Sequence, residues 1–171
     1  MSAQAHSASV NPAVLKDAMS RFITGVTVVT TRFEGVDYGM TCNSFNTVSL
    51  DPPMVMWCIR KTSQSHAAFA NKASLGAGYM VSILAADQHA VAMKFTQGSQ
   101  TERCEGVAVN RGASQFARLD GAVAWFDCSL EQVVSAGDHD ILVGRVQAVG
   151  TGQGAGLAYA QRQFGQMQAL A

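Results

Sequence analysis

Much of the chain consists of segments rich in β-branched and aromatic residues between turn formers, and only short stretches place apolar residues at the three- and four-residue spacing of a helix. The first helical stretch runs from Asn11 to Phe22, where Asn11 can cap the helix and Pro12 can occupy its first turn. Residues 1–10 are small and polar without periodicity, which predicts a flexible N-terminal tail. Residues 11–171 are predicted to form a single domain.

Strands are predicted wherever β-branched and aromatic residues gather between turn formers. These segments are 26–33, 36–45 after a turn at Gly35, 54–59, 76–84, and the two long runs 122–134 and 140–149, which the turn-forming sequence SAGDH joins. Two short helices are predicted, one carrying Phe69 and capped by Ser63 or Thr62, the other at 87–95 with Asp87 in its first turn. Residues 96–118 are predicted to be irregular. Long strands in succession with only short helices favour an antiparallel barrel over a parallel doubly wound sheet.

Composition narrows the classes of function. The chain has 171 residues, 48% of them apolar, which suits one domain with a sizeable core. Twelve basic residues balance twelve acidic ones without a dense cationic run, so neither nucleic acid nor an anionic membrane is an expected partner. The uncharged runs, such as 73–86, are shorter than a membrane span, and no basic segment followed by an apolar run opens the sequence. We therefore expect a soluble, cytoplasmic protein.

The spacing of residues argues against a metal site and against a dinucleotide-binding motif. Cys42, Cys58, Cys104 and Cys128 are far apart, form no CxxC pair and have no histidine at a zinc-ligand distance, so free thiols and no metal site are expected. GTGQGA, at 150–155, matches a loosened dinucleotide-binding pattern. The chain leaves no room after it for the second strand and acidic residue of that unit, so this interpretation is rejected.

The stretch GMTCNSFNTVSLDPPMVMWCI, residues 39–59, is too polar for an ordinary core strand although Asp51 is its only charge. Buried amides and hydroxyls need partners, because leaving one unpaired costs roughly 1–3 kcal/mol. A solvated sheet surface would satisfy these side chains, and so would a polar ligand. A second polar group follows at residues 60–65, where hydroxyls and two cations stand at a predicted helix start: this is either an ordinary cap or a site for phosphate.

Three motifs in order carry a family resemblance. The run from Phe22 to Ile59, the pattern S-x-S-H-x-x-F at 63–69 and GDH at 137–139 resemble the short-chain flavin reductases, in particular the reductase components of two-component flavin-dependent monooxygenases. The similarity extends from about residue 18 to residue 149. It implies a mainly β fold with short helices, the Greek-key antiparallel FMN-binding split barrel, and a homodimer.

The resemblance also assigns residues to a flavin. Segment 40–49 would face the hydrogen-bonding edge of the isoalloxazine ring, segment 60–65 would face the phosphate end, and the end of the second short helix would add contacts. The implied flavin-binding residues are Met40, Thr41, Cys42, Asn43, Ser44, Phe45, Val48, Ser49, Cys58, Arg60, Lys61, Ser63, Ser65, Phe69, Lys94 and Phe95.

GDH supplies the implied catalytic residues. A lone turn histidine is commonly a surface residue, but relatives place the equivalent of His139 beside the nicotinamide, with Asp138 alongside. The other histidines are weaker candidates, since His6 lies in the tail and His66 and His89 fall at helix starts. Without a basic cluster near GDH to pair a 2′-phosphate, NADH is favoured over NADPH.

The implied function is an NAD(P)H-dependent flavin reductase that reduces FMN or FAD and supplies it to a partner monooxygenase. Hydride transfer would then require alignment and charge stabilisation rather than a protein nucleophile. The choice between FMN and FAD, and between a bound and a diffusing flavin, stays open. A non-enzymatic FMN electron carrier of the same fold is the alternative; pyridoxamine phosphate oxidases and haem-handling proteins would be expected to have more charge than the 14% found here. For a dimer interface, Trp57, Trp125 and 54–56 are the candidates.

Overall fold

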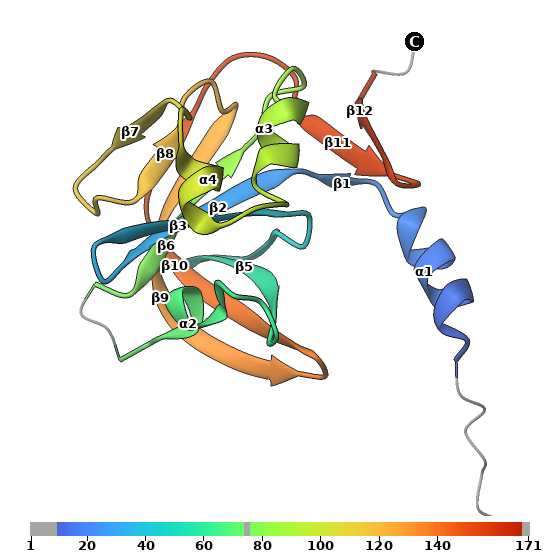
Figure 1. The fold of residues 1–171 in the computed structure, drawn as a ribbon, viewed down its shortest axis with the longest axis horizontal. Coiled ribbons are helices and arrows are strands. Elements are labelled where there is room, and N and C mark those ends of the chain that lie inside the picture. The colour runs from blue at the N-terminus through green and yellow to red at the C-terminus, as the bar shows by residue number, and fades with distance from the viewer. Residues whose placement is uncertain (1–9, 74–75, 169–171) are drawn as a thin grey trace, which may run out of the picture.

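The computed structural model of the chain describes residues 10–73 and 76–168 (Figure 1). The predicted tail at 1–10 therefore lies, apart from Val10, outside the described residues, as does His6. The helices are α1 (Pro12–Ser20), α2 (His66–Ala70), α3 (His89–Lys94) and α4 (Gln100–Cys104). The strands are β1 (Thr24–Gly25), β2 (Thr27–Phe33), β3 (Val36–Cys42), β4 (Asn46–Leu50), β5 (Pro53–Arg60), β6 (Gly78–Ile83), β7 (Val109–Arg111), β8 (Ala117–Leu119), β9 (Ala124–Ala136), β10 (His139–Thr151), β11 (Leu157–Ala160) and β12 (Gln163–Gln166).

Seven strands form the main sheet in the order β3-β2-β6-β9-β10-β5-β4, with every neighbouring pair antiparallel. The order departs from chain order because β6 lies between β2 and β9, while the β4–β5 hairpin pairs with β10 on its other side. Register shifts in the β9–β10 pair, at Val143/Gly144 and Val146/Ala148, are of the kind that lets long strands bend. The prediction of a mainly β, antiparallel barrel is confirmed. So is the rejection of GTGQGA, which leads from β10 to β11 without a helix.

Two apolar clusters lie on the two sides of β2. Val29 belongs to the cluster inside the barrel with Trp57 and Phe69, whereas Val28 belongs to the cluster beneath α3 with Phe95. Successive side chains of a strand point to opposite faces, so a strand covered on both faces has no polar alternation. The run VTVVTT, residues 26–31, lacks alternation for this reason and is buried throughout. Its threonine hydroxyls form hydrogen bonds with the backbone; Thr31 Oγ1, for example, donates to the Gly78 carbonyl at 2.7 Å.

Helix α1 begins as the sequence predicts, with Asn11 Oδ1 accepting a hydrogen bond of 2.9 Å from Ala13 N. None of its residues is buried, and the apolar side chains on and after it are open to solvent, Val14 at 65%, Met19 at 66% and Phe22 at 71%. Figure 1 shows α1 standing apart from the barrel, next to the β11–β12 hairpin. The predicted helix therefore forms, but its apolar face is not covered by any of the described residues.

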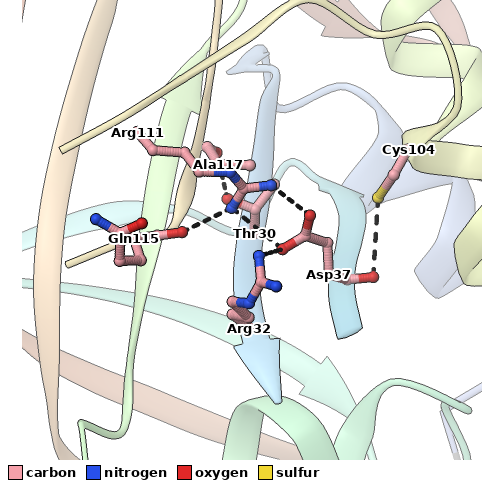
Figure 2. A network of polar contacts seen from close by, with 7 residues as sticks. All are labelled: Thr30, Arg32, Asp37, Cys104, Arg111, Gln115 and Ala117. Carbon is pink, nitrogen blue, oxygen red and sulfur yellow. Dashed lines mark hydrogen bonds and ion pairs between the residues drawn. The ribbon is translucent and has the colours of Figure 1, made fainter. Parts of the chain in front are cut away.

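The prediction that residues 96–118 are irregular is wrong. Ser99 and Glu102 form a capping box that starts α4, and β7 pairs with β8 beyond it. A polar network holds this excursion against the β2–β3 hairpin (Figure 2). Asp37 is its centre: Arg32 contacts its carboxylate at 3.5 Å, Arg111 forms two contacts with it, and Thr30 donates to the Ala117 carbonyl at 2.5 Å.

Smaller differences concern element ends. Helix α2 has Ser65 as its N-cap residue rather than Ser63 or Thr62, and Asp87 precedes the Gln88 cap of α3 instead of lying in the first turn. Strands β1, β4, β11 and β12 are not predicted, because they have only two to five residues each and a run that short gives little signal of a strand. None of the helices within the described residues is long and apolar enough to cross a membrane.

Candidate functional site

The polar segment between β3 and β4 lines two adjoining cavities of about 440 and 520 Å³. Asn43 and Tyr159 border both of them. The first cavity continues between α3 and the β11–β12 hairpin, past Met93, Thr96 and Phe164. The second continues between residues 43–46 and the end of α1. Two joined hollows with apolar walls and a polar edge suit a flat heteroaromatic ligand.

Several hydroxyls of this segment already have partners inside the protein. Thr41 Oγ1 donates to the Ala92 carbonyl at 2.5 Å, which ties β3 to α3. Ser44 Oγ accepts from Cys58 N at 2.9 Å and lies 3.1 Å from Cys42 Sγ, which ties the end of β3 to β5. Burial and the neighbouring Cys42 raise the pKa of the Cys58 thiol, so it stays protonated at neutral pH. The hydroxyls therefore shape the cavity, and the exposed amide of Asn43 is left to meet a ligand.

The remaining predicted flavin residues are distributed unevenly. Met40 and Phe45 are half-buried against the barrel core, Cys42 and Phe69 are buried in it, and Phe95 is buried beneath α3. Val48 and Ser49 lie at the β4 bulge near Met54, at the far end of β5 from Arg60, and line neither cavity. Lys94 lines a different cavity beyond α3, with Gln88 and Asp120. Segment 40–45 is thus the part of the prediction that the fold places at the two cavities.

Segment 60–65 folds as a tight turn from β5 into α2. Ser63 N donates to the Arg60 carbonyl at 2.9 Å, and Ser63 Oγ accepts from Ser65 N at 3.3 Å. Ser65 is buried, and its Oγ accepts from Gln100 Nε2 at 2.6 Å. The Arg60 side chain is exposed and makes no hydrogen bond or ion pair within the described residues. Arg60 is therefore the side chain of this segment that is free to receive an anion.

The GDH hairpin lies directly beside that segment. His139 is the Cα partner of Arg60 across the β5–β10 ladder, although 78 positions separate them. His139 Nδ1 lies 2.8 Å from Asp138 Oδ1, and this hydrogen bond, with the charge of the imidazole, holds the pKa of Asp138 below its usual value. Cys58, Arg60 and His139 share the outward face of the sheet, as period-two alternation requires. The fold thus joins segment 58–60 to GDH, and Ser44 joins both to segment 41–46.

The sequence interpretation missed two groups of residues. One is the β11–β12 hairpin, whose Tyr159, Arg162 and Phe164 form a wall of the first cavity. The other is Gln100, whose amide accepts from Gly39 N at 2.9 Å and donates to Ser65, and so connects two predicted ligand segments. The S-x-x-E capping signal at 99–102 could have placed Gln100 on a helix.

The fold adds to two arguments from the sequence. No basic cluster was expected near GDH, and the two cations that the fold brings there are Arg60, which lies opposite His139, and Lys61, which contacts Gly137. Trp57 is fully buried in the barrel and so is no interface residue, whereas Trp125 is half-buried beneath the guanidinium of Arg118 at 4.9 Å. The cysteines are free as expected, and within 10–73 and 76–168 no group of three or more acidic, cysteine or histidine residues could hold a metal.

Comparisons with known proteins match this chain to flavin reductases. Residues 19–168 match the flavin reductase like domain. The reductase component of the flavin-dependent trigonelline monooxygenase of Acinetobacter baylyi is 41% identical over 146 residues, which is 85% of this chain and 46% of that protein. The FMN reductase (NADH) SmoA of Agrobacterium fabrum is 35% identical over 162 residues, covering 91% of this chain and 86% of the relative.

A solved structure agrees with both. The NADH:FAD oxidoreductase SgcE6 of Streptomyces globisporus, determined in complex with NAD and FAD fragments, superimposes with a TM-score of 0.84 at 30% identity, covering 95% of this chain and 98% of that one. The chain spans about half the length of the trigonelline relative. Because its sequence matches the family model over residues 19–168 and its fold superimposes on a solved flavin reductase, the chain belongs to the flavin reductase-like domain family.

Proposed function

We propose that the chain is an NADH-dependent flavin reductase that reduces FMN or FAD and passes the reduced flavin to a partner monooxygenase. One observation carries the proposal: Ser44 ties the cavity-lining segment 41–46 to Cys58, two residues before Arg60, which pairs with His139. The elements expected to hold flavin and nicotinamide, far apart in sequence, therefore meet at one end of β5.

Each group has a definable task in this arrangement. The Asn43 amide can both donate and accept at the edge of a ring in the cavity, and Arg60 can meet a phosphate. With Nδ1–H donated to Asp138, His139 presents Nε2 as an acceptor for a carboxamide N–H. A bound flavin would supply the hydride acceptor and the nicotinamide the donor, so the protein has only to align them and to stabilise negative charge.

Anaerobic mixing with NADH and free flavin tests the proposal. Catalytic amounts of protein should bleach the visible absorbance of FMN or FAD, while NADH and flavin without protein should change far more slowly. No bleaching with either flavin and either nicotinamide would contradict the proposal. A protein that stays yellow after gel filtration and does not react with NADH would instead be an electron carrier of the same fold.

NADH is proposed as the preferred donor. SmoA and SgcE6 are named with NADH. Among the described residues beside the hairpin, Lys61 is paired with Gly137 and Ser135 and Arg60 has no partner, so they do not form a free basic cluster. A 2′-phosphate is typically recognised by cationic side chains that pair with it. A higher kcat/KM for NADPH than for NADH would reverse this assignment.

We also propose a homodimer and a monooxygenase partner. The partner follows from the name of the trigonelline relative.

The dimer is supported by the uncovered apolar residues of α1 and by half-exposed Met54 and Met56 on the outward face of β5. Because the end of α1 lines the second cavity, a second copy covering α1 would also adjoin the site. Light scattering at micromolar concentration should give twice the mass of the chain, and Leu15→Ser with Met19→Ser should lower it; a monomeric parent would contradict the dimer.

A further inference from the structure

Lys61 is positioned by the fold for a different task from the flavin contact that the sequence suggests. Its backbone N–H donates to the Asp138 carbonyl at 3.0 Å, and its Nζ donates to the Gly137 carbonyl and to Ser135 Oγ, both at 2.7 Å. The same Nζ lies 3.8 Å from Asp140 Oδ1. One residue at the end of β5 therefore contacts four residues of the GDH hairpin.

The far side of Asp140 is also occupied. Its Oδ2 lies 2.7 Å from His66 Nε2, at the first residue of α2, and only 12% of the Asp140 side chain is exposed. A lysine ammonium has three donors; here two are hydrogen-bonded, and the Asp140 carboxylate lies 3.8 Å from the nitrogen. A flavin phosphate would have to compete with these partners for Lys61, whereas the neighbouring Arg60 side chain makes no hydrogen bond or ion pair within the described residues.

We infer that Lys61, together with Asp140 and His66, positions the GDH hairpin, and through it His139, for the nicotinamide, and that Lys61 does not bind the flavin phosphate. This inference rests on the proposed function for its statement about the nicotinamide. The physical reason is local. Gly137 has a φ of +59°, a backbone conformation that glycine adopts at little cost, although glycine also adopts others. The hydrogen bond from Lys61 Nζ to the Gly137 carbonyl therefore restricts the conformations that the turn can adopt.

The variant Lys61→Met distinguishes a role in phosphate binding from a role in positioning the hairpin, when its affinity for FMN is compared with its affinity for riboflavin, which lacks the phosphate. We expect the Kd of each flavin to stay within about twofold of the parent, and kcat/KM for NADH to fall about tenfold with either flavin, since a displaced contact costs on that order. A Kd that rises for FMN but not for riboflavin would overturn the inference, as would unchanged kinetics.

Two further variants keep the test decisive. Lys72→Met removes an exposed lysine that lies outside the hairpin and should match the parent in every measurement. Ser135→Ala removes one partner of Lys61 without changing charge and should lower kcat/KM for NADH in the same direction by a smaller factor; if Lys61→Met does not fold, this variant carries the kinetic test, and unchanged kinetics overturn the inference. Should the parent itself fail to reduce flavin, the proposed function fails, while the FMN and riboflavin affinities still decide whether Lys61 binds phosphate.

Discussion

Two histidine–aspartate pairs involve the same hairpin, one through Asp138 and the other through Asp140, and they differ in how far their side chains are exposed to solvent. Asp138 pairs with His139 at 2.8 Å, with 81% and 37% of their side chains exposed. Asp140 pairs with His66 at 2.7 Å, with 12% and 27% exposed. Because side chains alternate along β10, His139 faces outward with Arg60, while Asp140 faces inward toward α2.

The difference in burial suits the two pairs to different roles, one in stability and the other in ligand binding. A carboxylate withdrawn from water needs its partners, and removing one leaves an uncompensated charge. An exposed pair contributes little to stability, because water replaces each partner at small cost. The inward pair is therefore suited to fix the join between α2 and β10, and the outward pair is free to meet a ligand. Each prediction below acts on one pair, and the largest and the smallest expected effects use the other pair as their control.

The largest expected effect is on stability, from Asp140→Asn. This change keeps the size of the side chain but leaves Lys61 without its counter-charge and weakens the bond to His66. Loss of a buried ionic partner costs roughly 3–5 kcal/mol, and since Lys61 is 38% exposed we expect about 2 kcal/mol here. Urea unfolding should show a lower midpoint with an unchanged slope. Asp138→Asn should leave the midpoint where it is; an equal shift in both variants would remove the distinction between the pairs.

The second effect is kinetic and belongs to His139. His139→Ala removes the contact that we propose between His139 and the nicotinamide, and we expect this change to lower kcat/KM for NADH by roughly ten- to a hundredfold, equivalent to about 1–3 kcal/mol. Flavin affinity should stay nearly intact, because the cavity is lined by residues 41–46 and the β11–β12 hairpin. Stopped-flow flavin reduction at sub-saturating NADH measures the change. His89→Ala, at the start of α3, is the matched control, and equal rates for His139→Ala and parent would return His139 to an ordinary surface turn.

The contrast also explains what the sequence could reveal. Six strands, β2, β3, β5, β6, β9 and β10, could be predicted from β-branched and aromatic residues between turn formers such as those around Gly35 and Gly137, because these signals are local. The structure of residues 96–118 could not be predicted in this way, because β7 and β8 have three residues each and depend on residues far away in the chain: Asp37 contacts Arg111 of β7, and Thr30 donates to Ala117 of β8. Propensity carries no information about such partners.

The same limit applies to the site. Residues 40–45 and 137–139 are recognisable as motifs, but no local pattern shows that Lys61 faces the hairpin rather than a phosphate, or that Ser65 is buried against Gln100. Nor does alternation alone pair Asp140 with His66, because that contact depends on how α2 packs over Trp57. Sequence therefore identified which residue types matter, and the long-range pairing of strands determined which of them remain free.

The smallest expected effect is a titration. The hydrogen bond from His139, and then its charge, lower the pKa of Asp138 below the usual 3.8. A carboxyl whose pKa is depressed in the folded state adds stability that is present above its unfolded value and lost as pH falls through the folded one, so this contribution should disappear only below about pH 4. In His139→Ala the carboxyl carbon of Asp138, followed by ¹³C NMR, should titrate at a higher pH than in the parent. His66→Ala should leave that titration unchanged, because His66 bonds Asp140 instead. If His66→Ala moved the Asp138 midpoint as far as His139→Ala does, the two pairs would be one coupled network rather than two independent ones.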